Sequence, residues 1–285
     1  MEIFDQKIAV VTGAASGIGR ATARALADAG CHIALVDVDA DGLQEVKKRI
    51  TSDKPATASR ALCYEVAVSD AEAMEELAQD VVAEFGAAHI VVNNAGINVT
   101  ARFEEHSLDD FKRTFDVNLW GVIHGCRAFL PYLRRVDQGH IVNISSAFGI
   151  VGVGGQSAYS ASKFAVRGLS ESLHEELAET SIGVSVVHPG CINTNILESA
   201  SIRDQTIADD ARAYFAQNGC APEKVADRIV EAIKNKDHRV LVTAEAHVFD
   251  WLRRLLPTTG NRLANRAMAR VLGVDIKALS EEEPQ

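Results

Sequence analysis

Seven short apolar runs, rich in valine and isoleucine, recur along the chain and constrain its fold more than any other feature. They begin at Lys7, His32, Arg60, His89, Gly139, Val184 and Arg239. Each run is apolar at nearly every position rather than at alternate positions, which is typical of strands covered by helices on both faces. The runs therefore predict a parallel sheet of about seven strands.

Longer amphipathic stretches separate the runs, and their apolar residues recur at helical spacing. In residues 70–85 these positions are Ala73, Met74, Leu77, Val81 and Phe85. Asp70 is expected to cap this helix, because a carboxylate is favoured at the positive end of a helix. The alternation of strands and helices predicts a doubly wound α/β fold with helices on both faces of the sheet.

The chain has 285 residues, and no Pro/Gly/Ser-rich linker, repeat or low-complexity tract divides it, so residues 1–285 are expected to form a single domain. Two segments fall outside the alternation of strands and helices. Residues 191–220 are too long for an ordinary connection, and we interpret them as a lid over a binding site. Residues 244–285 form a separate C-terminal segment, which we call the tail.

A glycine-rich turn follows the first run and leads into the first helix. It contains Gly13, Gly17 and Gly19. Free N–H groups and the positive dipole at the start of a helix can bind a pyrophosphate, so a glycine pattern in this position indicates a dinucleotide site on a Rossmann-like fold. The second run ends in Asp37, where a carboxylate accepts hydrogen bonds from the adenosine ribose and repels a 2′-phosphate. NAD is therefore favoured over NADP.

These motifs resemble those of the single-domain short-chain dehydrogenase/reductase family. The family's glycine motif T-G-x-x-x-G-x-G matches residues 12–19, and NNAG at 93–96, YSASK at 159–163 and PGCINT at 189–194 follow in the family's order. The resemblance covers residues 5–242 and implies an NAD(P)-dependent alcohol dehydrogenase or carbonyl reductase. One position departs from the pattern, because Ala67 stands where members often have an aspartate that meets the adenine. The backbone at Val68 and the shape of the site would then hold the adenine.

The resemblance also implies the site residues. The catalytic set is Asn118, Ser146, Tyr159 and Lys163. The implied cofactor contacts are Gly13, Ser16, Gly17, Ile18, Gly19, Asp37, Val38, Val68, Asn94, Ala95, Gly96, Tyr159, Lys163, Pro189, Gly190, Ile192 and Thr194. In the family the lysine binds the nicotinamide ribose, and the asparagine holds a water of a proton relay.

The spacing of three of these residues suits proton transfer. Tyr159 and Lys163 are four residues apart and share one helix face, so the ammonium is expected to lower the pKa of the phenol. Such a tyrosine can act as general base toward an alcohol and as general acid toward a ketone. Ser146 would stabilise charge on the same substrate oxygen, and Ser145 would point to the opposite side of the strand. The scattered histidines, His188 among them, are interpreted as structural, without a catalytic or metal role.

Apolar residues dominate the segments expected above the nicotinamide. They are Ile97, Val99, Phe148, Ile150, Val151, Val153, Ile196, Leu197 and Ile202. An apolar pocket predicts a small hydrophobic secondary alcohol or ketone as substrate. Two alternatives stay open, a 3-oxoacyl thioester reductase and, from another class, a non-catalytic dinucleotide sensor or scaffold on the same fold.

Composition restricts the partners and the compartment. A net charge of −10 disfavours nucleic acid. Five cysteines without a C-x-x-C pair speak against a metal site and against disulfides. The N-terminus lacks the basic and apolar regions of a signal peptide, and nowhere do about 18 apolar residues run uninterrupted. These features predict a cytoplasmic protein, which we expect to form a homodimer or homotetramer.

The tail is basic in an otherwise acidic chain. Residues 251–274 contain five arginines and no acidic residue. Leu252, Leu255 and Leu256, followed by Leu263 in a second short helix, are expected to form a buried apolar stripe with the arginines outward. The arginines would pair with acidic patches of the same or a neighbouring subunit, bind an anionic substrate tail, or contact an anionic membrane surface, and the first of these is favoured.

Overall fold

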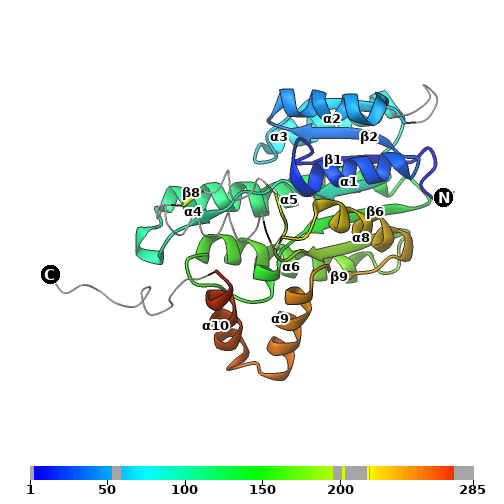
Figure 1. Cartoon of the computed structure of the whole chain (residues 1–285). Coiled ribbons are helices and arrows are strands. Elements are labelled where there is room, and N and C mark those ends of the chain that lie inside the picture. The colour runs from blue at the N-terminus through cyan, green and yellow to red at the C-terminus, as the bar shows by residue number, and fades with distance from the viewer. Residues whose placement is uncertain (1–2, 53–58, 195–200, 203–216, 218, 273–285) are drawn as a thin grey trace.

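A computed structural model describes residues 3–52, 59–194, 201–202, 217 and 219–272 of the chain, and its centre is one parallel sheet (Figure 1). The strand order is β3-β2-β1-β4-β6-β7-β9. The strands are β1 (Ile8–Thr12), β2 (His32–Asp37), β3 (Ala61–Glu65), β4 (Ile90–Asn93), β6 (Gly139–Ile144), β7 (Ile182–His188) and β9 (Arg239–Leu241). All seven predicted runs are strands, and every neighbouring pair is parallel. The predicted Rossmann-like fold is confirmed.

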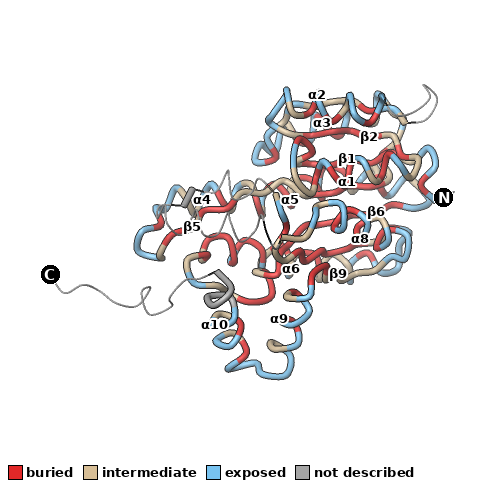
Figure 2. Tube along the Cα trace, in the orientation of Figure 1, coloured by how far each residue is buried: buried red, intermediate tan, exposed pale blue. Residues whose placement is uncertain are grey.

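Helices cover both faces of the sheet. One face packs against α1 (Gly17–Asp28), α2 (Ala40–Ser52) and α8 (Pro222–Asn235). The other packs against α3 (Ala71–Phe85), α5 (Gly121–Leu133) and α6 (Ser157–Leu177). In β1, Ala9 and Val11 belong to the first core, whereas Ile8 and Val10 belong to the second. Buried residues accordingly run along the whole length of the central strands, which explains why the apolar runs do not alternate (Figure 2).

Local sequence signals set the ends of α3. Asp70 is its N-cap, and the carboxylate accepts a hydrogen bond from the amide of Ala73 at 3.1 Å, as predicted. The helix ends at Gly86, whose φ of 85° is a left-handed conformation that glycine adopts without strain.

The strand order reverses between β3 and β4, because β2 and β4 lie on opposite sides of β1. Connections leaving β1 and β4 therefore diverge at their carboxyl ends, and a crevice opens there. Short elements surround this edge. They are β5 (Val99–Thr100), β8 (Ser201–Ile202), the 3₁₀ turns η1 (Phe103–Glu105) and η3 (Ala147–Gly149), the helix α4 (Leu108–Phe115) and the π-helix η2 (Asp116–Trp120). Most of the predicted lid, 191–220, lies outside the described residues.

The beginning of the tail forms a helical hairpin that extends away from the sheet (Figure 1). Its helices are α9 (Ala244–Leu255) and α10 (Gly260–Leu272). Ala246, Phe249 and Ala264 are buried against η3 and the two residues after it in a third apolar cluster.

The predicted buried stripe of the tail is wrong in part. Leu255, Leu256 and Leu263 are exposed, because a different face of each helix packs on the body. Among the described residues, no helix is both long and apolar enough to cross a bilayer.

Candidate active site

A cavity of about 880 Å³ opens at the carboxyl ends of β1, β2, β4, β6 and β7. The predicted site residues that line it come from every one of these strand ends. They are Gly13, Ser16, Gly17, Ile18, Asp37, Val38, Val68, Asn94, Ala95, Gly96, Ser146, Tyr159, Lys163, Pro189, Gly190, Ile192 and Thr194. Gly19 and Asn118 do not line the cavity, and both lie immediately behind its wall.

The glycine turn brings β1 and α1 close to the loop after β4. Gly13 has a φ of +65°, and a Cβ there would lie 2.7 Å from Nδ2 of Asn94. A Cβ at Gly19 would collide with the carbonyl oxygen of Gly13, which explains why Gly19 is needed although it does not face the cavity. The first turn of α1 contains no acidic residue, so its positive end stays free to bind an anion.

Asp37 stands at the end of β2 beside this turn. Its Oδ2 accepts a hydrogen bond from the amide of Ala15 at 3.0 Å, and its Oδ1 accepts one from the amide of Val38 at 2.8 Å. The carboxylate is therefore held in one orientation at the cavity wall. Ala67 and Val68 line the same end, where Ala67 offers only a methyl group. The carbonyl of Val68 is 2.9 Å from Nδ1 of His124, which fixes this segment on α5.

Tyr159 and Lys163 lie on the first turns of α6, and Ser146 follows β6. Tyr159 is 9% exposed and Lys163 is 3% exposed. The Lys163 ammonium donates to the carbonyl of Ile144 at 2.9 Å and lies 5.7 Å from the centre of the Tyr159 ring. Ser146 Oγ accepts a hydrogen bond from the amide of Phe148 at 3.1 Å. Ser145 differs from it, because its hydroxyl is turned to the carbonyl of Lys163 at 2.8 Å.

Burial dominates the electrostatics of this cluster. It raises the pKa of Tyr159 above 10, although a hydrogen bond with Ser146 acts in the opposite direction. Burial also lowers the pKa of Lys163 to about 8. The predicted lowering of the tyrosine pKa is therefore wrong, because loss of water outweighs the hydrogen bond with Ser146.

Asn118 lies in η2, where the helix between α4 and α5 widens by one residue. Its Oδ1 accepts from the amide of Ile97 at 2.8 Å, and its Nδ2 donates to the carbonyl of Ile97 at 2.9 Å. The side chain is fully buried. A π-helix often marks a functional position, and here it directs the amide of Asn118 at the strand-β4 loop next to Lys163.

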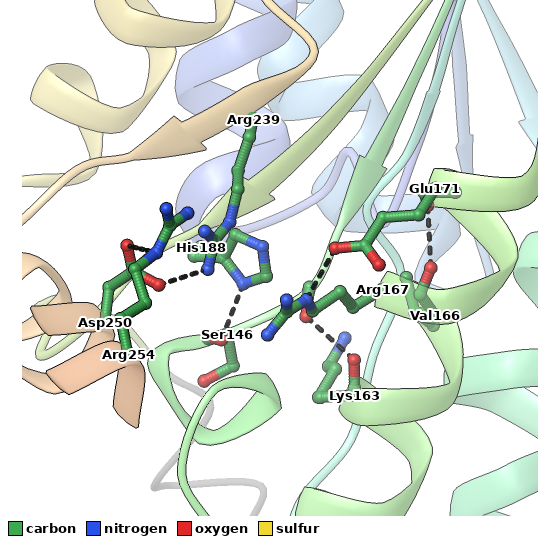
Figure 3. Close-up of polar contacts among 11 residues, drawn as sticks. Ser146, Lys163, Val166, Arg167, Glu171, His188, Arg239, Asp250 and Arg254 are labelled. Carbon is green, nitrogen blue, oxygen red and sulfur yellow. Dashed lines mark hydrogen bonds and ion pairs between the residues drawn. The ribbon is translucent and has the colours of Figure 1, made fainter. Parts of the chain in front are cut away.

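A polar cluster lies behind Ser146 (Figure 3). His188, at the end of β7, is fully buried, and its Nδ1 donates to the carbonyl of Ser146 at 3.0 Å. Asp250 pairs with Arg239 at 2.6 Å and with Arg254 at 3.0 Å, which ties α9 to β9. His188 thus contacts the backbone of a predicted catalytic residue, a role that the sequence did not indicate.

The C-terminal hairpin contributes residues to the cavity that sequence reasoning missed. Glu245, Val248 and Phe249 of α9 and Ala267 of α10 line it. Oε1 of Glu245 accepts a hydrogen bond from the amide of Cys191 at 2.6 Å and so holds the turn after β7. The spacing of 245, 248 and 249 marks one helix face, but nothing in the sequence states what that face packs against.

The predicted substrate-side residues are only partly placed at the cavity. Ile97 and Phe148 line it. Ile150, Val151 and Val153 instead pack beneath the hairpin, because α9 covers them, and Val99 is buried. Ile196 and Leu197, and the side chain of Ile202, lie outside the described residues.

Comparison with known proteins agrees with this arrangement. The model of the short chain dehydrogenase family matches residues 7–205. A protein named "Putative oxidoreductase SadH", from Mycobacterium tuberculosis, is 40% identical over 276 residues, which cover 95% of this chain and 98% of that protein. The chain therefore belongs to the short-chain dehydrogenase family of oxidoreductases.

Solved structures show the same fold. A short-chain dehydrogenase/reductase from Burkholderia phymatum in complex with NAD is 29% identical, with a TM-score of 0.79, and the match covers 99% of this chain and 98% of that one. An alcohol dehydrogenase from the archaeon Thermococcus sibiricus, complexed with 5-hydroxy-NADP, is 28% identical with a TM-score of 0.71, over 82% of this chain and 95% of that one.

Proposed function

We propose that this chain transfers a hydride between NAD and a hydrophobic secondary alcohol or ketone, with Tyr159 as the general acid/base. The observation that supports this most directly is that Tyr159 and Ser146 share one cavity with the glycine turn and Asp37. When bound, the nicotinamide supplies or accepts the hydride.

The chain's own residues handle the proton. The raised pKa keeps Tyr159 protonated at neutral pH, so its hydroxyl is ready to donate to a ketone oxygen. The hydroxyl of Ser146 stabilises the charge that develops on the same oxygen. Lys163 would hold a hydroxyl of the nicotinamide ribose, and Asn118 orders the loop beside it through its two hydrogen bonds with the backbone of Ile97.

The preference for NAD rests on Asp37. Both of its oxygens already accept backbone hydrogen bonds, so the carboxylate cannot turn away from a 2′-phosphate without losing them. Solved relatives include complexes with NAD and with a derivative of NADP, so the family alone does not decide the preference.

The substrate class rests on the far wall of the cavity. Phe148, Val248 and Phe249 present apolar groups there. Burial of apolar surface in such a pocket favours a hydrophobic substrate. Glu245 is the acidic group of this wall, and it disfavours a free carboxylate on the substrate.

Replacement of Tyr159 by phenylalanine tests the proposal. We expect kcat to fall by about 10²–10⁴-fold, because the ring stays in place but its proton is lost. The dissociation constant of NADH, measured by fluorescence titration, should change less than about threefold, since the phenol does not hold the pyrophosphate. A variant that keeps more than about a tenth of the parental kcat would refute the role of Tyr159.

A substrate panel with the parental chain separates the alternatives. It contains neutral hydrophobic secondary alcohols, their ketones, and 3-oxoacyl thioesters with a phosphate-bearing carrier. Preference for the thioesters in kcat/KM would assign a 3-oxoacyl thioester reductase. NADH binding without turnover of any substrate would assign a dinucleotide sensor or scaffold.

A further inference from the structure

The α9–α10 hairpin has a second apolar face, which is exposed. On α9, Val248, Trp251 and Leu255 follow one another at helical spacing, and they are 53%, 68% and 64% exposed. The side of the helix opposite Trp251 and Leu255 carries Ala246 and Phe249 and is buried on the body, and Val248 lies at the border between the two sides. An amphipathic helix needs one apolar face to pack on its own protein, so the second face needs another explanation.

The exposed face begins at the active-site cavity and ends at the tip of the hairpin. Val248 lines the cavity and is also half exposed. On α10, Ala267 lines the cavity, and Leu263, four residues earlier, is exposed on the same side of the helix. We call Val248, Trp251, Leu255 and Leu263 the hairpin face. It extends from the cavity lining at Val248 to the turn between α9 and α10, and this turn lies far from the sheet (Figure 1).

The segment that carries most of the hairpin face is rich in arginine. Residues 251–272 contain Arg253, Arg254, Arg262, Arg266 and Arg270 and no acidic residue, in a chain whose net charge is −10. Arg262 and Arg266 are exposed, and Arg254 is 66% exposed although it pairs with Asp250. This segment would therefore be attracted to an anionic surface, although the chain as a whole is acidic.

A second pair of exposed apolar residues has the opposite charge in its surroundings. Phe103 and Leu108 are 72% and 76% exposed near the start of α4. Four acidic residues lie near them in sequence, Glu104, Glu105, Asp109 and Asp110, against one arginine, Arg102, next to Phe103. An anionic surface would repel this pair, so exposed apolar residues occur with a positive border at the hairpin face and with a negative border near α4.

We propose that the hairpin face docks on the surface of an anionic lipid bilayer. Trp251 and Leu255 would enter the headgroup region, where tryptophan is favoured, and the arginines would lie beside the lipid phosphates. The cavity mouth at Val248 then faces the lipid, so a ketone or alcohol dissolved in the bilayer reaches the pocket without crossing water. This statement about the substrate rests on the proposed function, whereas the docking itself does not.

Tryptophan fluorescence tests the docking directly. The chain has two tryptophans, so a Trp120→Phe chain reports on Trp251 alone. We expect its emission to shift to the blue with vesicles of equal parts phosphatidylglycerol and phosphatidylcholine, and not with phosphatidylcholine alone. Co-sedimentation should show the same selectivity and should weaken in 0.5 M salt, in which the charges are screened. Absence of binding to the anionic vesicles would overturn the proposal.

Three matched double variants locate the contact. Trp251→Ser with Leu255→Ser, and Arg262→Gln with Arg266→Gln, should each weaken the vesicle partition coefficient by about tenfold or more. Phe103→Ser with Leu108→Ser removes similar exposed apolar groups beside acidic residues and should leave the coefficient unchanged. Equal losses in all three variants would overturn the proposal. Binding is measured without cofactor or substrate, so its failure is distinct from a failure of the proposed function.

The same variants would also show whether a second copy of the chain or its own C-terminal residues cover the hairpin face. If the Trp251/Leu255 variant loses subunit assembly in light scattering while the parental chain does not bind vesicles, the face contacts a second copy. If a chain that ends at residue 272 binds vesicles and the full chain does not, residues 273–285 occupy the hairpin face. These residues include Asp275 and three glutamates. Either result would overturn the proposal. Unchanged turnover of a water-soluble ketone by both hairpin variants verifies their folding.

Discussion

Single residues at this site owe their chemistry to burial as much as to their neighbours. Tyr159 and Lys163 are both almost inaccessible to water, and burial favours the neutral form of each. At neutral pH the lysine is still mainly charged, because its pKa of about 8 lies above 7, and the tyrosine is protonated. Tyr159 therefore carries a proton at neutral pH that it can donate, which agrees with the proposed reduction of a ketone.

Asp37 is expected to control cofactor choice. In Asp37→Ala, the hydrogen bonds to the ribose and the repulsion of a 2′-phosphate are lost together, so the ratio of kcat/KM for NAD over NADP should fall by about tenfold or more. Asp39→Ala is the matched control, since Asp39 follows two residues later and does not line the cavity. A parental chain that already prefers NADP would contradict this prediction.

His188 is expected to position Ser146. His188→Phe removes the donor to the Ser146 carbonyl, and we predict a kcat about tenfold lower, with little change in the dissociation constant of NADH. His188→Asn retains an amide donor near the position of Nδ1 and should recover most of the loss. Thermal unfolding of both variants separates this effect from destabilisation. Equal kcat values for the Phe and Asn variants would show that the hydrogen bond has no positioning role.

At the scale of elements, the hairpin is an addition to the sheet with its own small core. The third apolar cluster joins α9 and α10 to η3 and lies apart from the two clusters that flank the sheet. Glu245 and the Asp250 ion pairs attach α9 to the ends of β7 and β9. Because its apolar core is separate, we expect the hairpin to unfold locally at a lower free energy than the sheet.

Phe249→Ala is the test at this scale. Loss of this buried ring is expected to lower the free energy of unfolding of the hairpin by about 3 kcal/mol. Hydrogen exchange in residues 244–267 should accelerate while β1 and β6 stay protected, and KM for a hydrophobic ketone should rise. Leu255→Ala, on the exposed face, is the control and should change neither. A uniform loss of protection across the sheet would mean that the hairpin unfolds together with the rest.

At the scale of the whole molecule, buried histidines make stability depend on pH. His140 and His188 are nearly inaccessible, and burial lowers the pKa of each from 6.5 to about 4. Between these values the unfolded chain binds more protons than the folded chain. Stability is therefore complete above pH 6.5 and is lost as the pH falls toward 4, by up to about 3 kcal/mol for each ring.

Urea unfolding at pH 7, 6, 5 and 4.5 measures this dependence. His140→Gln, which retains an amide near Ser185, should reduce the loss of unfolding free energy between pH 7 and 4.5 by about 2 kcal/mol. His247→Gln, at an exposed position, is the matched control and should leave the slope unchanged. The same slope in the His140 variant and the parental chain would exclude His140 as its source.

The sequence by itself determined the sheet and the turn at its edge. Continuous apolar runs specify strands, Asp70 specifies a cap, and Gly13, Gly17 and Gly19 specify a turn, because each of these depends on neighbours within a few residues. The motif order also identified the family, and it led to the prediction that Ser146, Tyr159 and Lys163 act together. Their roles remain predictions until the variants are measured.

Tertiary structure decided which residues distant in sequence are in contact. Sequence periodicity marks the faces of α9, but it cannot tell that Phe249 is buried and Leu255 exposed, because that depends on contacts with η3 about 100 residues earlier in the chain. The same holds for Glu245 on the turn after β7 and for His188 beneath Ser146. The direction of the Tyr159 pKa shift was also missed, since desolvation is set by all the atoms that surround a group and not by the spacing of two residues on a helix.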